Sequence, residues 1–259
     1  MMKWNGGDKL QHPGMTINDR YKFVRAGGFI KSGLISWWGL NEASGTRNDQ
    51  HGSNHLTDNN TVTAATGLVV PNAASFASAS TEYLSRADNA DLSLASGSWT
   101  IAGWVRPTGL SADWAWVSKY QSTGNDKGFF AGYYQPSDRF YFVVSADGSA
   151  TTNVFANNHG APDNSTWVYY VIYHDAARGV IGIQIDNGTA DESAYASGSI
   201  YDTATAFCLS GINLNTGLKF NGRMEQVGVW RRVLDDFEKS WLYNSGAGRS
   251  YRDLIGNLT

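Results

Sequence analysis

Near its end the chain reads Phe220-Asn-Gly-Arg-Met-Glu-Gln-Val-Gly-Val-Trp-Arg-Arg-Val-Leu-Asp-Asp-Phe-Glu-Lys-Ser-Trp-Leu-Tyr-Asn-Ser-Gly246, and this stretch decides the fold. Asn221-Gly222 predicts a tight turn, because both residues tolerate a positive φ. The residues that follow, Met224–Trp230, alternate in the way that suits a strand. This alternation puts Val227 and Val229 on one face and Met224, Gln226 and Trp230 on the other.

The second half of the stretch predicts one short amphipathic helix. Asp235 or Asp236 offers the carboxylate that caps a helix N-terminus. Apolar side chains then share one helical face, namely Phe237, Trp241 and Leu242. Gly246 is the expected stop, because glycine readily takes the left-handed conformation that ends a helix. A strand followed by a single helix closes a domain that is otherwise built of strands.

Composition agrees with one β domain. The chain has 259 residues, which is enough for a large sandwich with a substantial core. Charged residues make up 17%, below the roughly 25% that is typical of soluble domains. No apolar run approaches the roughly 20 residues that span a bilayer. The net charge of -3 argues against a general nucleic-acid binder. We therefore expect neither nucleic acid nor membrane insertion.

Short apolar strands recur along the chain between turn signals. The clearest is Ser98–Pro107, which carries bulky apolar groups on both faces and so belongs between two layers. Further strands are expected at Trp114–Tyr120, Gly128–Tyr134, Phe140–Ala146, Thr151–Ala156, Trp167–His174 and Val180–Ile185. Many short strands at this spacing predict an all-β fold, a two-sheet antiparallel jelly-roll sandwich with a short C-terminal helix.

Several segments resemble laminin-G-like domains of the concanavalin A-like lectin/glucanase superfamily. The resemblance is dense in Phe220–Gly246, and it recurs in the opening Gly33–Thr46, in Ser98–Pro107 and in Trp167–Val171. Together these segments cover about residues 33–247 in the family's order. The resemblance implies a concanavalin A-like jelly roll, which we place at residues 33–259.

Residues 1–32 match no family segment and predict an extended basic arm. Residues 1–33 contain six basic and two acidic residues, a net charge of +4 on a chain whose remainder is acidic. Such an arm suits docking onto other protein subunits and an oligomer or larger assembly, and a solvated tail is the alternative. The first residues also lack the apolar core of a signal peptide, so we expect synthesis in the cytoplasm.

Aromatic side chains are the candidate carbohydrate-binding residues, because flat rings stack on the apolar faces of pyranoses. Trp114 and Trp116 lie two residues apart on one expected strand, and Tyr120 continues the even spacing. The neighbouring strands can add Tyr133, Tyr134 and Tyr141. The alternative is that these rings fill the core of the sandwich.

Calcium is the metal that the resemblance implies. Many relatives bind one calcium ion between the opening loop and the closing strand, which carries over to Glu42 and Glu225. Glu225 stands where the family has aspartate, and calcium needs six to eight oxygen ligands. The alternative is that Glu225 only begins a strand and pairs with an arginine.

Catalysis has no visible basis in the sequence. The superfamily's enzymes place carboxylates on one strand as E-x-D-x-x-E, and this string is absent. We therefore expect a protein that is not an enzyme: a lectin-like jelly roll that binds surface glycans or neighbouring subunits on a larger assembly. By analogy of fold, that assembly is a bacteriophage virion, with the chain as a decoration or fibre protein. A glycan-active hydrolase or lyase, and a purely structural sandwich, are the alternatives.

Overall fold

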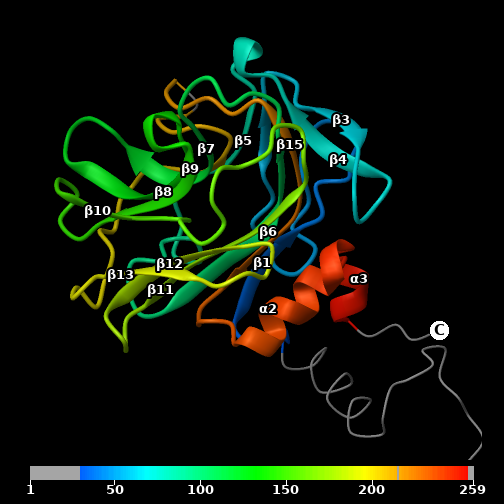
Figure 1. Cartoon of the computed structure of the whole chain (residues 1–259). Coiled ribbons are helices and arrows are strands. Elements are labelled where there is room, and N and C mark those ends of the chain that lie inside the picture. Colours follow the sequence, from blue (N-terminus) through cyan, green and yellow to red (C-terminus); the bar gives the residue numbers. More distant parts are fainter. Residues whose placement is uncertain (1–29, 215, 256–259) are drawn as a thin grey trace, which may run out of the picture.

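The computed structural model describes residues 30–214 and 216–255, and in these ranges the chain forms two stacked antiparallel sheets (Figure 1). The predicted jelly-roll sandwich with a short C-terminal helix is confirmed. The predicted arm lies outside the described residues except at its end. There Ile30 is buried, and its carbonyl accepts the indole N–H of Trp230 at 2.7 Å.

One sheet has eight strands. Its order is β13 (Asp191–Ala194), β12 (Val180–Ile185), β11 (Val168–Asp175), β6 (Trp99–Pro107), β15 (Gly222–Trp230), β4 (Asn72–Phe76) and β3 (Thr63–Thr66), with β1 (Leu34–Trp38) also paired to β15. The central position of β6 explains why both of its faces are apolar.

The other sheet has seven strands. Its order is β10 (Thr151–Phe155), β9 (Arg139–Ser145), β8 (Asp126–Tyr134), β7 (Trp114–Gln121), β14 (Phe207–Leu209), β5 (Tyr83–Arg86) and β2 (Thr57–Asn59). Short helical turns η1 (Ser78–Ser80) and η2 (Gln135–Ser137) lie between strands. Strands β2, β3, β13 and β14 are additions to those expected from the sequence.

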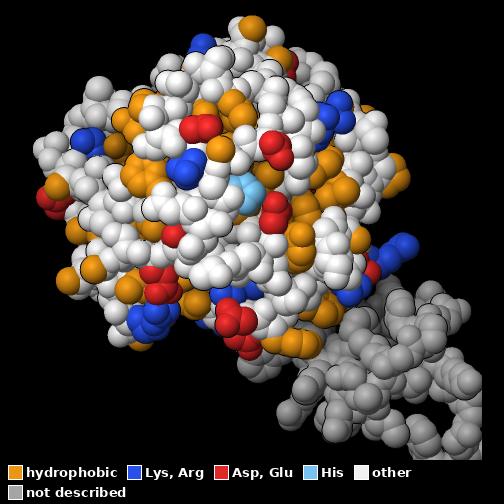
Figure 2. Space-filling model, viewed as in Figure 1, with side chains coloured by type: hydrophobic (Ala, Val, Ile, Leu, Met, Phe, Trp, Pro, Cys, Tyr) orange, Lys and Arg blue, Asp and Glu red, His pale blue; other side chains and the backbone are white. Residues whose placement is uncertain are grey.

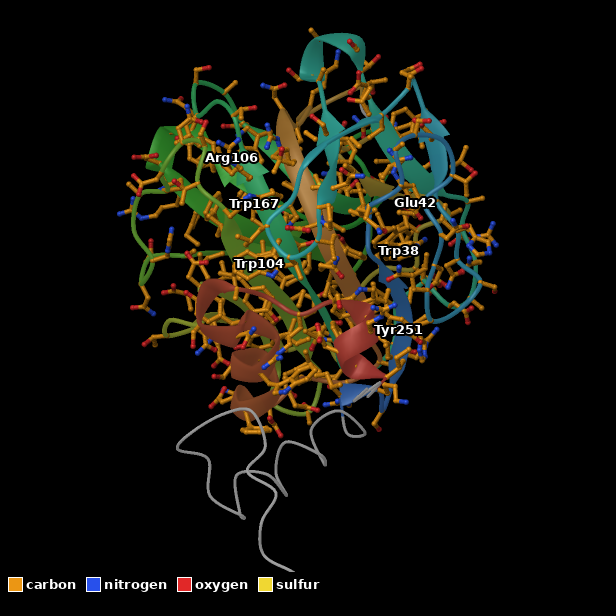
Figure 3. All side chains as sticks on the ribbon, turned by 90° about the vertical axis from the view of Figure 1, so that its right-hand side faces the viewer. Trp38, Glu42, Trp104, Arg106, Trp167 and Tyr251 are labelled. Carbon is orange, nitrogen blue, oxygen red and sulfur yellow. The ribbon has the colours of Figure 1, made fainter. Side chains whose placement is uncertain are left out.

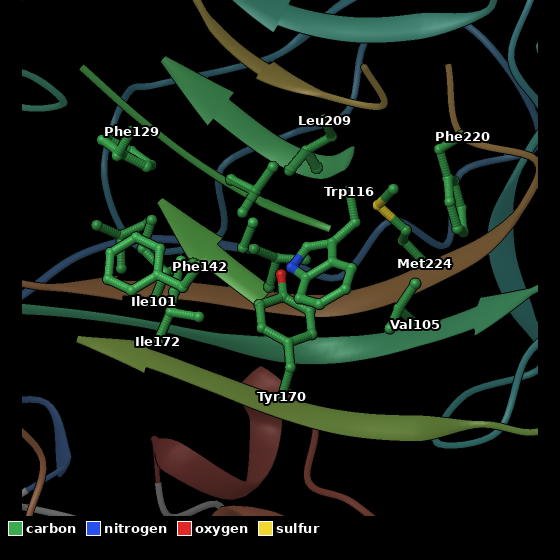
Figure 4. Close-up of a cluster of buried hydrophobic side chains, with 14 of the residues drawn as sticks. Ile101, Val105, Trp116, Phe129, Phe142, Tyr170, Ile172, Leu209, Phe220 and Met224 are labelled. Carbon is green, nitrogen blue, oxygen red and sulfur yellow. The ribbon is translucent and has the colours of Figure 1, made fainter. Parts of the chain in front are cut away.

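The main core lies between the sheets, where apolar side chains of both inner faces meet (Figure 4). Trp116 of β7 points across this space, and its ring centroid lies 5.0 Å from that of Tyr170 on β11. Trp99 similarly contacts Phe129, at 5.0 Å, and Phe142. Rings that interlock across the layers fix the distance between the two sheets.

A β-bulge in β15 changes the predicted alternation. Its pairing with β6 shifts between Glu225 and Gly228, and Gln226 takes a positive φ of 53°. Because a bulge adds one residue, Met224 joins Val227 and Val229 in the core instead of facing away from them. The expectation for Met224 was therefore wrong.

Helix α2 (Asp236–Tyr243) and helix α3 (Tyr251–Leu254), joined through η3 (Asn244–Gly246), cover the outer face of the eight-stranded sheet (Figure 3). Asp235 caps α2 by accepting the N–H of Glu238 at 2.8 Å, within a complete capping box. Trp241 and Leu242 are buried as expected, whereas Phe237 is exposed. The buried face includes Glu238 because its carboxylate pairs with the Arg232 guanidinium through two contacts of 2.6 Å.

The end of α2 also differs from the prediction. Asn244, not Gly246, is the residue that takes the left-handed conformation after the helix, with a φ of 50°. No helix among the described residues is long and apolar enough to cross a membrane.

Candidate functional site

The outer face of the seven-stranded sheet carries a row of aromatic side chains. Tyr120 on β7, Phe130 on β8 and Tyr141 on β9 form a cluster with Val143 and Ile212 that is separate from the inter-sheet core. Tyr134 and Phe155 pack against this cluster and are partly exposed. The matching face of the other sheet is covered by α2 and α3, but no helix packs on this row within the described residues.

The rings contact one another in a continuous series. The Tyr120 and Phe130 centroids lie 4.9 Å apart, and those of Phe130 and Tyr141 lie 5.2 Å apart, both edge to face. Tyr141 stacks on Phe155 with an interplanar angle of 12°, and Tyr134 contacts both of these rings. These contacts hold the rings in place, so the row is preorganised before any ligand arrives.

The row also presents hydrogen-bonding groups. The hydroxyls of Tyr120, Tyr134 and Tyr141 have no hydrogen-bond partner among the described residues, and they are not among the side-chain atoms buried away from solvent. Burial of the ring, and then the charge of Asp113, raises the pKa of Tyr141. Burial also raises the pKa of Tyr120. The Tyr120 and Tyr141 hydroxyls therefore stay protonated at physiological pH and can both donate and accept hydrogen bonds.

The row is bordered by two loops that Asn213 joins. Its side-chain oxygen accepts the N–H of Ser122 at 2.7 Å, and its amide donates to the Ser122 hydroxyl at 2.8 Å. Its backbone N–H donates to the carbonyl of Tyr120 at 3.1 Å. Ile212 and Leu218 of the same loop pack on the row, and Leu214 is 51% exposed. The site therefore has an aromatic floor and a rim with both polar and apolar groups.

Three of the six predicted carbohydrate-binding residues lie in the inter-sheet core and are a correction to the prediction. Trp114, Trp116 and Tyr133 are between 0% and 4% exposed and belong to the main core cluster. The Trp114 indole donates to the carbonyl of Gly109, and the Tyr133 hydroxyl donates to the Asp138 carboxylate at 2.8 Å. No face of these rings is open to a sugar.

The bulge in β7 explains why Tyr120 does not follow Trp114. The pairing of β7 with β8 shifts between Ala115 and Val117, so Trp116 is an extra residue. Trp116 and Val117 consequently both reach the core, and Tyr120 turns to the outer face. The structure thus brings Tyr120, Tyr134 and Tyr141 together and separates them from the other three.

Sequence reasoning missed Phe130 and Phe155 as members of the row. A signal for Phe130 was present, because it stands four residues from Tyr134 on one strand and therefore shares its face. The same rule shows that the neighbours Tyr133 and Tyr134 cannot face one ligand together. Phe155 lies next to Tyr141 through the pairing of β10 with β9, which the sequence alone does not give.

The two carboxylates expected at a calcium site have different environments. Glu225 is fully buried, and its oxygens accept the backbone N–H groups of Leu68 at 2.5 Å, Val69 at 2.9 Å and Val70 at 3.4 Å. Glu42 accepts the N–H of Asn48 at 2.8 Å through Oε1, and its Oε2 is buried without a partner. No group of three or more acidic, histidine or cysteine side chains suited to a metal occurs in the described residues.

Glu225 therefore fits an anchor for residues 68–70 better than a calcium ligand. The alternative expected from the sequence was that Glu225 pairs with an arginine. In the structure its carboxylate binds backbone N–H groups instead. Burial raises its pKa, against the effect of the three backbone hydrogen bonds. The calcium prediction stays a prediction that depends on Glu42.

Replacing Glu225 with alanine should destabilise the fold without depending on calcium. Three N–H groups would lose their acceptor, and we expect a loss of about 2 to 4 kcal/mol in the free energy of unfolding. Urea denaturation in EDTA and in calcium chloride measures this. If the loss appears only in calcium, Glu225 is a metal ligand and its role as an anchor is wrong.

Comparison with known proteins places the chain in a known fold family. A family model described as "Concanavalin A-like lectin/glucanases superfamily" matches residues 78–238. No curated protein matches the chain in sequence.

Several solved structures resemble the chain. The binding domain of Paraclostridial Mosquitocidal Protein 1 has a TM-score of 0.65 and 13% identity, over 84% of this chain and 53% of that one. The botulinum neurotoxin serotype G binding domain has a TM-score of 0.63 and 15% identity, over 81% and 50%. The binding domain of botulinum neurotoxin DC, in complex with SialylT, has a TM-score of 0.60 and 13% identity, over 83% and 52%. The chain thus spans about half the length of these structures, and identities this low show the fold alone.

Proposed function

The chain belongs to the concanavalin A-like lectin/glucanase superfamily, and we propose that it is a non-enzymatic recognition protein whose aromatic row binds glycans. The row is the outer-face set Tyr120, Phe130, Tyr134, Tyr141 and Phe155.

The observation that carries this proposal is the exposed edge of the row. A monomeric protein normally covers an apolar sheet face, as α2 and α3 cover the other sheet. Here the rings are held by one another, and Tyr134 and Phe155 are partly exposed, whereas Tyr120 and Tyr141 are 9% and 8% exposed. The three tyrosine hydroxyls have no partner among the described residues and are not among the buried atoms. Ring edges and faces suit the C–H groups of a pyranose, and the hydroxyls suit its polar groups.

Binding is favoured over catalysis by the chemistry of the row. A retaining glycosidase needs two carboxyl groups about 5 Å apart, with one of them protonated. At the row, the acidic residue whose charge affects the pKa of Tyr141 is Asp113. Its carboxylate already accepts the backbone N–H of Gln135 at 2.8 Å. The similar solved structures are binding domains by their titles. A hydrolase or lyase activity is the alternative, and it would appear as shortened glycan after incubation.

Replacing Tyr141 with alanine tests this function. Tyr141 contacts Phe130, Tyr134 and Phe155, so its loss opens the centre of the row. We expect the wild type to bind a subset of a glycan array and the variant to lose at least about tenfold in affinity. Tyr141→Phe keeps the ring, so it should keep most of the binding. Binding by this variant shows that position 141 can be changed without loss of the fold.

The matched control is Phe237→Ala on α2. Phe237 is also a surface aromatic residue, 48% exposed, but it lies on the opposite side of the sandwich. Its replacement should leave glycan binding unchanged. Equal losses from Tyr141→Ala and Phe237→Ala, or no binding by the wild type with or without calcium, would contradict the proposal.

We further propose that the protein acts on a larger assembly, as a bacteriophage decoration or fibre protein in a virion that uses residues 1–32 to contact other subunits. The support is the basic arm on an acidic chain. Deleting residues 1–29 should abolish association with that assembly and leave glycan binding intact. Size-exclusion chromatography with light scattering would show whether the arm also makes the free chain an oligomer.

A further inference from the structure

A hollow lies at the outer face of the eight-stranded sheet, on the opposite side of the molecule from the aromatic row. It has a volume of about 830 Å³ and opens between β11, β12 and β13 on one side and the start of α2 on the other. Acidic and basic side chains gather over this region, along the lower part of the view in Figure 2. Ligand sites for small molecules commonly have volumes of about 300 to 1,000 Å³, so the size is suitable.

Two residues of the hollow's lining, Tyr173 and Glu192, lie on the strands to either side of Gly182. Tyr173, Gly182 and Glu192 are in register on β11, β12 and β13. A Cβ atom on Gly182 would lie 2.1 Å from the Tyr173 ring, so only glycine lets the ring lie across β12. The Tyr173 hydroxyl thereby reaches the Glu192 carboxylate at 2.6 Å.

The charged groups around the hollow are already paired. The Arg178 guanidinium binds the Glu192 carboxylate through two hydrogen bonds, of 2.7 and 2.6 Å. Lys239 is 6% exposed, and its ammonium lies 2.7 Å from the Asp236 carboxylate and 5.7 Å from the Tyr173 ring centroid. Such pairs hold their side chains in place and leave Arg178 and Lys239 each with a carboxylate partner, so neither cation is free to select an anion.

Gln184 on β12 supplies the unused hydrogen-bonding capacity. It lines the hollow, is only 7% exposed, and donates from Nε2 to the carbonyl of Gly188 at 2.6 Å. Its Oε1 is buried and has no hydrogen-bond partner in the described residues. A buried amide oxygen without a partner costs free energy, and a ligand hydroxyl can supply the missing donor.

We propose that this hollow is a separate binding site for one neutral pyranose unit. The hydroxyls of the pyranose would donate to Gln184 Oε1 and to the Glu192 carboxylate. They would accept hydrogen bonds from the Arg178 guanidinium. Val233 and Ala190 would contact the apolar C–H groups. A neutral polyol fits better than an anion, because each cation here already has its carboxylate and Asp235 adds a further negative charge.

The experiment uses the full chain and four probes, the methyl glycosides of glucose, galactose, mannose and N-acetylglucosamine, with glucuronic acid for comparison. Binding is measured by saturation-transfer NMR and titration. Gln184→Met keeps the side-chain size and removes the free acceptor, whereas Thr189→Trp fills the hollow from its exposed rim. Thr63→Trp on β3, at the opposite edge of the same sheet, is the matched control.

We expect at least one neutral glycoside to bind the wild type and to lose tenfold or more in affinity in both Gln184→Met and Thr189→Trp. Thr63→Trp should bind like the wild type. The variants of the hollow are compared in the Tyr141→Ala background, so that glycoside bound at the aromatic row does not enter the measurement. The proposal is overturned if no neutral glycoside binds, if glucuronic acid binds more tightly than all four, or if Thr189→Trp binds as well as Thr63→Trp.

Discussion

Replacing Asp49 with alanine is expected to destabilise the protein by about 4 kcal/mol, because buried N–H groups would lose their acceptor. Asp49 lies in the loop after β1 and is 6% exposed. Its carboxylate accepts the backbone N–H groups of Trp37, His51, Gly52 and Asn54 at 2.9 to 3.0 Å. Urea denaturation monitored by tryptophan fluorescence measures the change.

The same residue gives the stability a defined pH dependence. Burial acts to raise the pKa of Asp49, but the four hydrogen bonds together outweigh it, so the pKa is lowered. This stabilisation is present above the unfolded carboxyl's pKa of about 3.9 and is lost as the pH falls through the folded pKa. The stability gap between the wild type and Asp49→Asn should therefore be constant near neutral pH and shrink on acidification.

Asp147→Ala is the control for both measurements. Asp147 also accepts two backbone N–H groups, those of Ser149 and Ala150, each at 2.8 Å, but in an exposed turn. Water can replace its carboxylate there, so only a small loss of stability is expected. If Asp147→Ala destabilises the chain as much as Asp49→Ala, burial is not what makes Asp49 important.

Replacing Trp116 with alanine should cost about 3 to 5 kcal/mol, as truncation of a buried tryptophan typically does. Its side chain is fully buried, and its ring lies 5.0 Å from Tyr170, 5.4 Å from Phe140 and 5.7 Å from Trp114. The cavity would lie between the two sheets, where the surrounding strands cannot collapse into it (Figure 4). Thermal and urea unfolding measure the loss.

Trp116→Phe separates packing from recognition. It retains a ring and removes an indole N–H that has no partner, so the stability loss should be smaller. Glycan binding should stay at the wild-type level, because Trp116 does not reach the outer face. If a stable Trp116→Phe protein lost glycan binding, Trp116 would take part in binding, and its assignment to the core alone would be wrong.

The sandwich and its closing helix could be predicted because local signals agree with the fold. Val180–Ile185 alternates and is followed by Asp186-Asn187, which take φ values of 49° and 57° in a tight turn. Asp235 and Glu238 have the spacing of a capping box, and the structure contains that box. Turn chemistry and capping depend on a few neighbouring residues, so one sequence carries them.

The faces of the strands could not be predicted with the same success. An additional residue at Trp116 and another at Gln226 each reverse the alternation for the rest of the strand. A bulge depends on pairing with β8 or β6, which is not local, so a count of every second residue fails there. This is why Trp114 and Met224 were placed on the wrong side.

The hollow beside α2 was beyond sequence reasoning for another reason. It joins Tyr173, Gln184 and Glu192 to Lys239, which come from the sheet edge and from the closing helix. Each is an ordinary polar residue in its own segment. Only the position of α2 on the sheet makes them one site, and that position depends on packing around Trp241 and Leu242.

The central claim is that the aromatic row on the seven-stranded sheet binds glycan and does not cleave it. Its most direct test is an NMR titration of the chain, labelled with carbon-13 in its aromatic rings, with the tightest glycan found on the array. We expect shifts in the ring signals of Tyr120, Tyr134 and Tyr141, none in Trp116, and a glycan of unchanged length afterwards. If the ring signals of those three tyrosines do not shift, or if the glycan is shortened, the central claim is wrong.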